Sequence, residues 1–136
     1  MPPREGCRDM IGGTMTAAIP HVVRLSAELA NPEEYLPPAE KIIAGEPRQR
    51  IWSRYTDPSG QFTTGIWEGE PGTWRIRYTE EEYCRVLEGR SVLTANDGKA
   101  LQVGLGDEFV IPRGFEGTWQ VVERTRKVYV IYEAQQ

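Results

Sequence analysis

Histidine is the residue that this sequence most clearly lacks, since His21 is the one histidine among 136 residues. Imidazole is the commonest metal ligand in proteins and the usual base of Ser-His-Asp and Cys-His catalysis. Sites of either kind built on several histidines therefore have no support. His21 precedes every strand-like segment and is predicted to be a surface residue.

Cysteine, excess charge and long apolar runs are scarce as well. Cys7 and Cys84 form no C-x-x-C pair, so neither a disulfide framework nor a zinc knuckle is indicated, and a reduced, cytoplasmic setting is expected. The net charge of −4 combines 16 basic with 20 acidic residues, which predicts no broad basic face for nucleic acid. No apolar run approaches the ~20 residues of a membrane span, so a membrane is not an expected partner either.

Helical periodicity is missing too. The best helix candidates are Ser26–Ala30 and Pro32–Leu36, and the prolines that follow end the second one. From Ile51 onward, short apolar and aromatic runs alternate with glycine, proline and asparagine, including a strong hairpin signal at Asn96–Gly98. This pattern predicts about nine strands, at 51–56, 62–68, 74–79, 82–87, 90–95, 100–103, 108–111, 118–122 and 127–132.

The chain is long enough for one domain with its own core. Residues 1–20, which are broken by glycine and proline, are expected to form a flexible N-terminal extension. Residues 21–50 are expected to form an arm that packs on the barrel through apolar side chains such as Tyr35 and Ile42. Residues 51–136 are expected to form the barrel itself.

Two glycine-bounded motifs are the most specific feature of the chain. They read EYCRVLEG over Glu82–Gly89 and GDEFVIPRGFEGTW over Gly106–Trp119. Together with further matches, they resemble the cupin superfamily and, more narrowly, the DUF861-type family of the (S)-ureidoglycine aminohydrolase cupin domain. Those further matches are Gly65-Ile-Trp67-Glu, Pro71-Gly72, Tyr78, Leu93-Thr94, Gly98, Arg126-Lys127 and Tyr129.

The resemblance implies an all-β cupin jelly-roll barrel, also described as a double-stranded β-helix or RmlC-like fold, with an N-terminal arm. It also implies where a metal would be held, because the four ligand places of metal-binding cupins correspond here to Ile76, Tyr78, Glu82 and Gly117. Of these, Glu82 alone is an ordinary ligand, whereas catalytic zinc takes about three protein ligands. We therefore expect no metal cofactor and do not transfer the family's manganese-dependent release of ammonia from a ureido compound.

A shifted transition-metal site is the remaining alternative for a cofactor. It would combine Glu82 with Glu116 or Cys84. Strand alternation, combined with the strand register that the resemblance implies, instead predicts a mostly apolar ligand-binding pocket inside the barrel, closed by Trp119 and in addition by Trp52 or Trp67. Its predicted residues are Ile76, Tyr78, Glu82, Cys84 and Trp119.

Glu82 has two interpretations. It is either a structural glutamate hydrogen-bonded to Tyr78 or to a backbone amide, or a general acid/base that acts with Tyr78. A carboxyl group desolvated by apolar walls keeps its proton to higher pH, which would suit proton transfer near neutral pH. Cys84 is predicted to be a small buried hydrophobe rather than a nucleophile, because no histidine is available as its base.

Two further groups of side chains, the aromatic residues and a basic cluster, each have two possible roles. The aromatic side chains either fill the core or stack a planar ligand. Arg124, Arg126 and Lys127 are predicted to be a solvated strand end paired to carboxylates, with an anion-recognition patch at the barrel mouth as the alternative.

Three functions follow from these residues. The first is a metal-free barrel that binds a small molecule. The second is a hydrolase or isomerase acting on a small polar metabolite through Glu82. The third is a structural or interaction module, and in each case a homodimer is expected because pairing protects strand edges.

Overall fold

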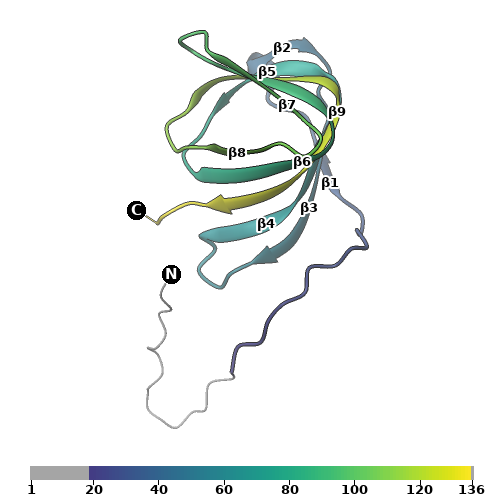
Figure 1. Ribbon diagram of the computed structural model, residues 1–136, viewed down its shortest axis with the longest axis vertical. Helices are drawn as coiled ribbons and strands as arrows, with labels where there is room; N and C mark the ends of the chain where they lie inside the picture. The colour runs from purple at the N-terminus through teal and green to yellow at the C-terminus, as the bar shows by residue number, and fades with distance from the viewer. Residues whose placement is uncertain (1–18, 136) are drawn as a thin grey trace.

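The computed structural model describes residues 19–135, so the expected extension over residues 1–20 lies almost wholly outside the described residues. Within them the chain forms nine strands and one short 3-10 helix, which confirms the all-β prediction (Figure 1). No helix in this part of the chain has the length and hydropathy to cross a membrane. The elements are β1 (Glu33–Tyr35), η2 (Ala39–Lys41), β2 (Ile42–Gly45), β3 (Gln49–Thr56), β4 (Phe62–Gly69), β5 (Gly72–Arg77), β6 (Glu81–Ala95), β7 (Ala100–Gly104), β8 (Glu108–Ile111) and β9 (Glu116–Tyr132).

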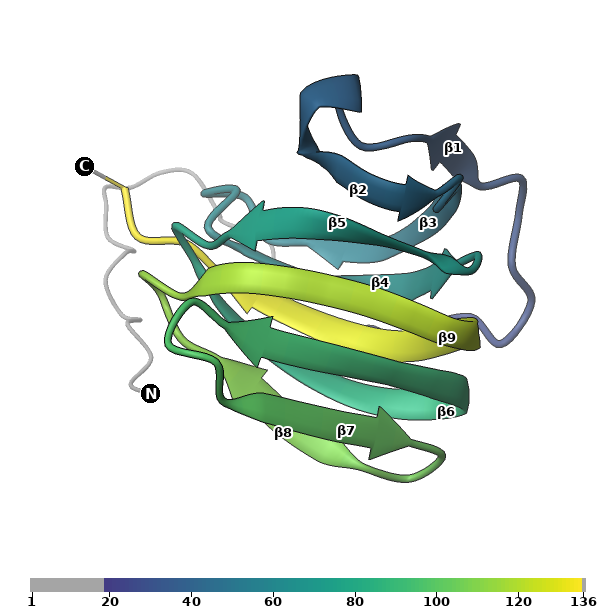
Figure 2. The ribbon, with the colours of Figure 1, turned by 90° about the horizontal axis from the view of Figure 1, so that it is seen from above.

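Two long strands, β6 and β9, run through both layers of the barrel (Figure 2). The first part of β9 pairs with β5 and its last part pairs with β4. Along one edge, β6 pairs with β9; along the other edge it pairs with β8 and then with β7. One layer is therefore β2-β5-β9-β6-β7 and the other is β1-β3-β4-β9-β6-β8, all antiparallel. This curled, two-layered arrangement is the predicted jelly roll.

In two places the sequence predicted separate strands where the structure has one long strand: 118–122 and 127–132 are both part of β9, and the same holds for β6. The ranges 82–87 and 90–95 are both part of β6, which passes from one layer to the other around Gly89. Gly89 has φ +90°, and a Cβ built there would lie 1.9 Å from the carbonyl oxygen of Arg124 on β9. Glycine therefore lets β6 bend while it stays close to β9, so the chain crosses between layers without a turn.

The hairpin predicted at Asn96–Gly98 is confirmed as the turn between β6 and β7. The amide of Ala95 donates to the carbonyl of Lys99 at 2.8 Å, and Gly98 has φ +96°. A Cβ at Gly98 would meet open space, so its glycine is explained by the backbone angle alone.

The prediction of a helix before residue 37 is wrong. Residues 26–30 follow the outside of β3, where Trp52 Nε1 donates to the Ala30 carbonyl at 2.7 Å and Arg54 donates to the Ser26 carbonyl at 3.0 Å. Glu33–Tyr35 forms β1 on the edge of β3. The prolines leave too few residues to sustain a helix, whereas β3 offers unpaired backbone groups along its edge.

The hydrophobic core lies between the two layers. Its aromatic members come from β4, β5 and β9, and they also form the wall of an internal cavity. Trp52 lies outside the barrel, so Trp67 rather than Trp52 takes part in closing that cavity. The buried core residues are Trp67, Trp74, Cys84, Val86, Leu93, Val103, Ile111, Trp119, Val121 and Tyr129.

Candidate functional site

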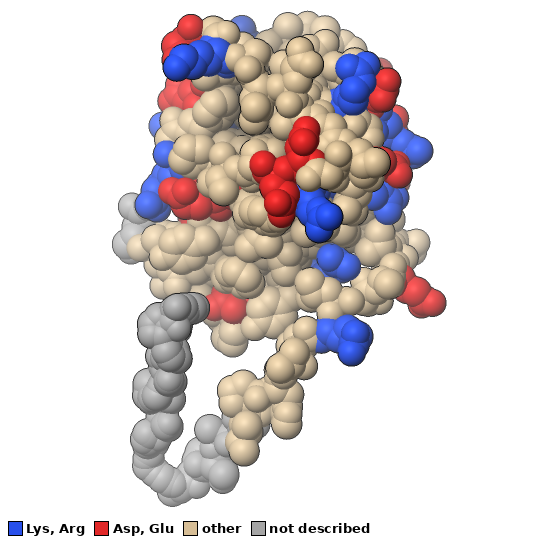
Figure 3. Space-filling view, in the orientation of Figure 1, with Lys and Arg blue, Asp and Glu red and all other residues tan. Residues whose placement is uncertain are grey.

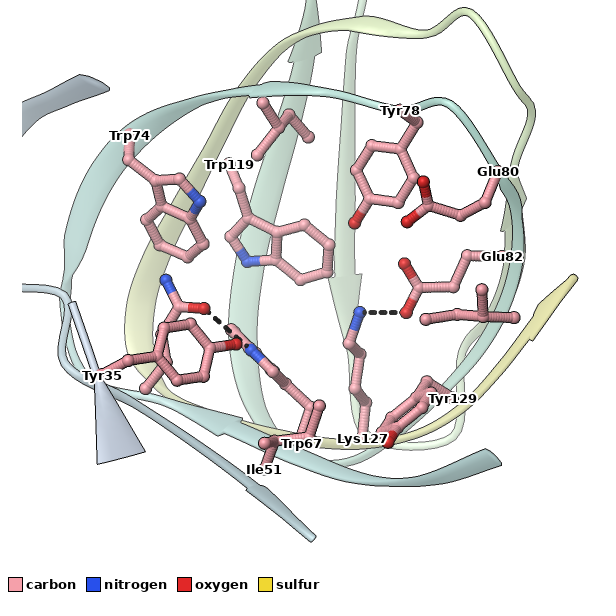
Figure 4. A pocket seen from close by; sticks show the side chains of 13 residues that line it. Tyr35, Ile51, Trp67, Trp74, Tyr78, Glu80, Glu82, Trp119, Lys127 and Tyr129 are labelled. Atoms are coloured by element: carbon pink, nitrogen blue, oxygen red, sulfur yellow. Dashed lines mark hydrogen bonds and ion pairs between the residues drawn. The ribbon is translucent and has the colours of Figure 1, made fainter. Parts of the chain in front are cut away.

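A cavity of about 190 Å³ lies inside the barrel (Figure 4). Side chains from both layers line it, and they come from the strands β1, β3, β4, β5, β6 and β9 and from the loop between β5 and β6. The lining residues are Tyr35, Gln49, Ile51, Trp67, Trp74, Ile76, Tyr78, Glu80, Glu82, Trp119, Lys127, Tyr129 and Ile131.

The structure brings most of the predicted pocket residues together. Ile76, Tyr78, Glu82 and Trp119 all line the cavity. Cys84 does not line it. Cys84 lies two residues beyond Glu82 on β6 and is fully buried. Its sulfur contacts Lys127, whose side chain does line the cavity.

The four places that would hold a metal do not fit one. Ile76 and Gly117 are direct partners across β5 and β9, and neither offers a side-chain donor atom. A Cβ at Gly117 would lie 2.0 Å from the carbonyl oxygen of Thr94, so no side chain can be placed there without moving β6. Within residues 19–135, no group of three or more histidine, cysteine, aspartate or glutamate side chains could hold a metal ion.

A buried lysine engages the carboxylate at this site. Lys127 Nζ lies 2.9 Å from Glu82 Oε2, and the two side chains are 4% and 6% exposed. The ammonium group also lies 3.3 Å from Cys84 Sγ. Its distances to the ring centroids of Trp119 and Trp67 are 4.4 and 5.0 Å, within the range of cation–π attraction. Figure 4 shows Lys127 reaching up between Trp119 and Glu82, so the cation beside Glu82 belongs to the protein itself.

The charge of Lys127 is maintained by its neighbours. Burial alone lowers the pKa of Lys127, but Cys84 and the Glu82 carboxylate more than reverse this effect, and the net pKa is raised. Cys84 is a neutral thiol at neutral pH, because burial raises its pKa to about 12, so Glu82 supplies the balancing charge there. A raised lysine pKa means that the ion pair contributes its full stability below the ordinary lysine pKa and loses it only as the pH rises through the folded value.

The environment of Cys84 predicts an unreactive thiol. In a Cys7→Ser variant, Cys84 is the one remaining cysteine, and we expect a disulfide reagent at neutral pH to leave it unmodified while the protein is folded, because the thiolate is the reactive form. The same variant unfolded in guanidinium should react completely. Rapid labelling of the folded variant would contradict this prediction.

Lys127 is the residue whose role the sequence-based reasoning missed. The structure separates the predicted basic cluster, because β9 buries alternate residues and Lys127 shares its inward parity with Trp119. Arg124 and Arg126 point to the other face, where their guanidinium groups lie 3.8 and 3.2 Å from Glu68. The prediction of a solvated strand end paired to carboxylates is therefore correct for the two arginines and wrong for Lys127. Strand parity counted from Trp119 was the available signal.

The opposite wall of the cavity carries a second polar group. Gln49 on β3 is 5% exposed, and its Oε1 accepts a hydrogen bond from Trp67 Nε1 at 3.0 Å. The Gln49 Nε2 atom is buried and has no hydrogen-bond partner in the described part of the chain. Because an indole nitrogen only donates, Trp67 fixes the amide orientation and leaves the Nε2 hydrogens available.

Three indole rings form the walls between these polar groups. Trp74 and Trp119 are stacked at 16° with centroids 6.2 Å apart, and Trp67 lies 5.3 Å from Trp119. Tyr78 adds a phenol, whose pKa is raised well above its usual value by burial and then by the charge of Glu82. At neutral pH the cavity lining therefore carries the Lys127 ammonium group and the Tyr78 phenol, with the neutral Cys84 thiol buried behind it, and none of the three is in a nucleophilic form. Such a site is suited to binding a flat molecule.

The face of the molecule seen in Figure 3 carries charges of both signs side by side. Exposed ion pairs such as Arg77–Glu116 and Arg90–Glu123 have separations of 3.4 and 3.2 Å. Pairs of this kind typically contribute 0–1 kcal/mol each. The unusual electrostatics of the molecule are thus inside the barrel.

Comparisons with known proteins agree with this fold. The chain matches the family model of the EutQ-like cupin domain over residues 56–129, more than half of its length. A search of curated proteins found no match.

Solved structures of similar fold come from several bacteria. A Pseudomonas syringae pv. tomato DC3000 protein of unknown function from the DUF861 family has a TM-score of 0.69 at 25% identity, over 77% of this chain and 44% of that one. The Clostridium difficile EutQ protein has a TM-score of 0.59 at 21% identity, over 65% of each chain. A putative ethanolamine utilization protein Q of Salmonella typhimurium LT2 has a TM-score of 0.57 at 20% identity, over 64% of this chain and 71% of that one.

The match spans less than two thirds of the first two of these proteins. At 20–21% identity, the likeness to the two ethanolamine utilization proteins shows a shared fold alone. The matching family model and the DUF861 relative confirm the resemblance predicted from the glycine-bounded motifs. This chain belongs to the family of EutQ-like cupin domains.

Proposed function

We propose that this cupin binds a small organic molecule in its barrel without a transition metal, and that the Lys127–Glu82 ion pair stands where a metal centre would otherwise lie. The observation that carries the proposal is the 2.9 Å contact between Lys127 Nζ and Glu82 Oε2. A divalent cation bound to Glu82 would have to displace this ammonium group or accept its repulsion at close range. It would also lack further ligands, since Ile76 and Gly117 provide none.

The dimensions of the cavity limit the size of the ligand. Its volume of about 190 Å³ is below the roughly 300–1,000 Å³ of sites for drug-sized ligands. The lining combines aromatic walls with a few polar groups at defined places, which is the usual composition of a small-molecule site. A compact metabolite with a flat body fits this description.

The alternative of an enzyme that uses Glu82 as general acid/base receives less support. A general base must be within hydrogen-bond reach of the proton that it removes. One oxygen of Glu82 is already held by Lys127, and the phenol of Tyr78 is kept protonated by burial and by the nearby charge. These contacts favour a fixed binding group over one that exchanges protons with a substrate.

A fragment screen tests the proposal. Flat compounds of low molecular mass should raise the melting temperature, because a ligand that binds the native state alone stabilises it by about 2.7 kcal/mol at a concentration of 100 times its Kd. The shift should be the same with and without EDTA, and protein purified without chelators should hold no stoichiometric transition metal. An Ile76→Phe variant, which narrows the cavity, should lose the shift, whereas Leu105→Phe on the exposed β7–β8 turn should keep it.

A stoichiometric metal in the purified protein would contradict the proposal. So would a ligand-induced shift that disappears on addition of EDTA and returns with a divalent metal.

A further inference from the structure

Gln49 carries a hydrogen-bond donor that no residue between 19 and 135 engages. Its side chain is buried, its Nε2 atom lacks a partner, and it lines the cavity. Buried polar groups in folded proteins are nearly always hydrogen-bonded, and an exception calls for an explanation. A ligand that places an acceptor oxygen against Nε2 would supply the missing bond.

The orientation of this donor is fixed by the neighbouring indole. Trp67 Nε1 can only donate, and it donates to Gln49 Oε1 at 3.0 Å. Turning the amide over would place two donors face to face, so the Nε2 hydrogens stay free for a partner other than Trp67. An acceptor group, such as a carbonyl oxygen, is therefore the complementary partner.

Across the cavity, Glu82 offers the opposite chemistry. A carboxylate accepts hydrogen bonds and cannot donate them. Lys127 engages Oε2, and the carboxylate still has lone pairs for further donors, of which the neighbouring Tyr78 phenol is one and a ligand N–H could be another. The β3 side of the cavity thus presents a donor and the β6 side presents an acceptor.

The charges in the cavity select against an ionic ligand. Lys127 and Glu82 balance each other at 2.9 Å, and Glu80 is a further carboxylate in the lining. An anion would approach two carboxylates, of which only Glu82 is paired with the internal cation. A cation would approach the ammonium group of Lys127. A neutral molecule avoids both costs.

We infer that the ligand is a small, neutral, planar molecule with a conjugated amide-type edge, whose carbonyl oxygen accepts from Gln49 Nε2 and whose N–H donates to Glu82. The flat part of the molecule lies against the stacked pair Trp74 and Trp119. This inference rests on the proposed function and specifies the class of ligand for the same cavity.

Four probes of similar size test the inference by calorimetry and thermal shift. Benzamide is neutral and has both an acceptor and a donor, benzoate is an anion, benzylamine is a cation and toluene is apolar. Benzamide is expected to bind best. Gln49→Leu should weaken benzamide about tenfold, as expected for the loss of one buried hydrogen bond, and leave toluene unchanged.

A second substitution at Gln49, a matched control and an NMR measurement distinguish loss of the hydrogen bond from loss of the fold. Gln49→Glu retains an acceptor for Trp67 but removes the donor, so it should weaken benzamide in the same way. Gln120→Glu makes the same change at an exposed position of β9 and should have no effect. If the Gln49 variants fail to fold, the side-chain amide resonance of Gln49 in the unaltered protein should shift on addition of benzamide and not of toluene.

Tighter binding of benzoate or benzylamine, or benzamide binding that is indifferent to Gln49, would overturn the inference and leave the metal-free binding function in place. If none of the four probes binds, the inference is likewise overturned. The fragment screen with and without EDTA then decides the proposed function separately.

Discussion

A Lys127→Met substitution is expected to lower the free energy of unfolding by about 3–5 kcal/mol, the usual effect of removing one partner of a buried ion pair. The loss of stability comes from Glu82, which would be left without its ion-pair partner. Its carboxylate would remain buried, with the indole rings of Trp67 and Trp119 nearby and without the ammonium group that now lies 2.9 Å away. Urea unfolding followed by tryptophan fluorescence measures this change.

A matched pair of variants separates the charge from the packing. Lys127→Met/Glu82→Met removes both charges and should recover most of the lost stability, because well-packed apolar replacements of a buried pair are often neutral or stabilising. Lys99→Met makes the same change at an exposed position and should alter stability by no more than about 0.5 kcal/mol. A Lys127→Met protein as stable as the unaltered one would show that the ion pair is not the centre of the site.

A Gly89→Ala substitution is expected to cost about 3–5 kcal/mol, from a positive φ together with a steric clash. The added Cβ would lie 1.9 Å from the Arg124 carbonyl oxygen and 2.7 Å from the Cα of Thr125. Both contacts are with backbone, so no side-chain rotation relieves them. The bend that carries β6 between the two layers would have to open.

Gly98→Ala is the control for the backbone angle. Its φ of +96° is close to the +90° of Gly89, but a Cβ there meets open space. We expect a cost of about 1–2 kcal/mol at Gly98 from the angle alone. Equal costs at the two positions would show that β6 and β9 do not approach each other closely at Gly89.

The fold was predictable because its signals are local. Alternating apolar residues between turn residues predicted the strands, and Asn96–Gly98 predicted a hairpin that the structure contains. The continuity of β6 was not predictable, because the sequence does not distinguish a glycine that lets two strands cross closely from a glycine that lets the chain turn. Gly89 is distinguished from Gly98 by the Arg124 carbonyl beside it, which is a contact between distant parts of the chain.

The cavity was predictable in part. Strand alternation groups Ile76, Tyr78, Glu82 and Trp119 by face, and the register implied by the family resemblance turns that face inward; the structure places all four in the lining. Lys127 and Gln49 could not be assigned from their residue types, because a buried lysine or glutamine depends on partners that only the tertiary fold supplies. Those partners are Glu82 for Lys127 and Trp67 for Gln49.

The close packing at Gly117 limits which substitutions could add a metal ligand to this barrel. The carbonyl of Thr94 fills the place of a Cβ there, so a single mutation to histidine would collide with a neighbouring strand before it could offer an imidazole. A metal centre at this place would therefore need β6 to move away from Gly117, in addition to new donor groups and the removal of the ammonium group that now lies 2.9 Å from Glu82.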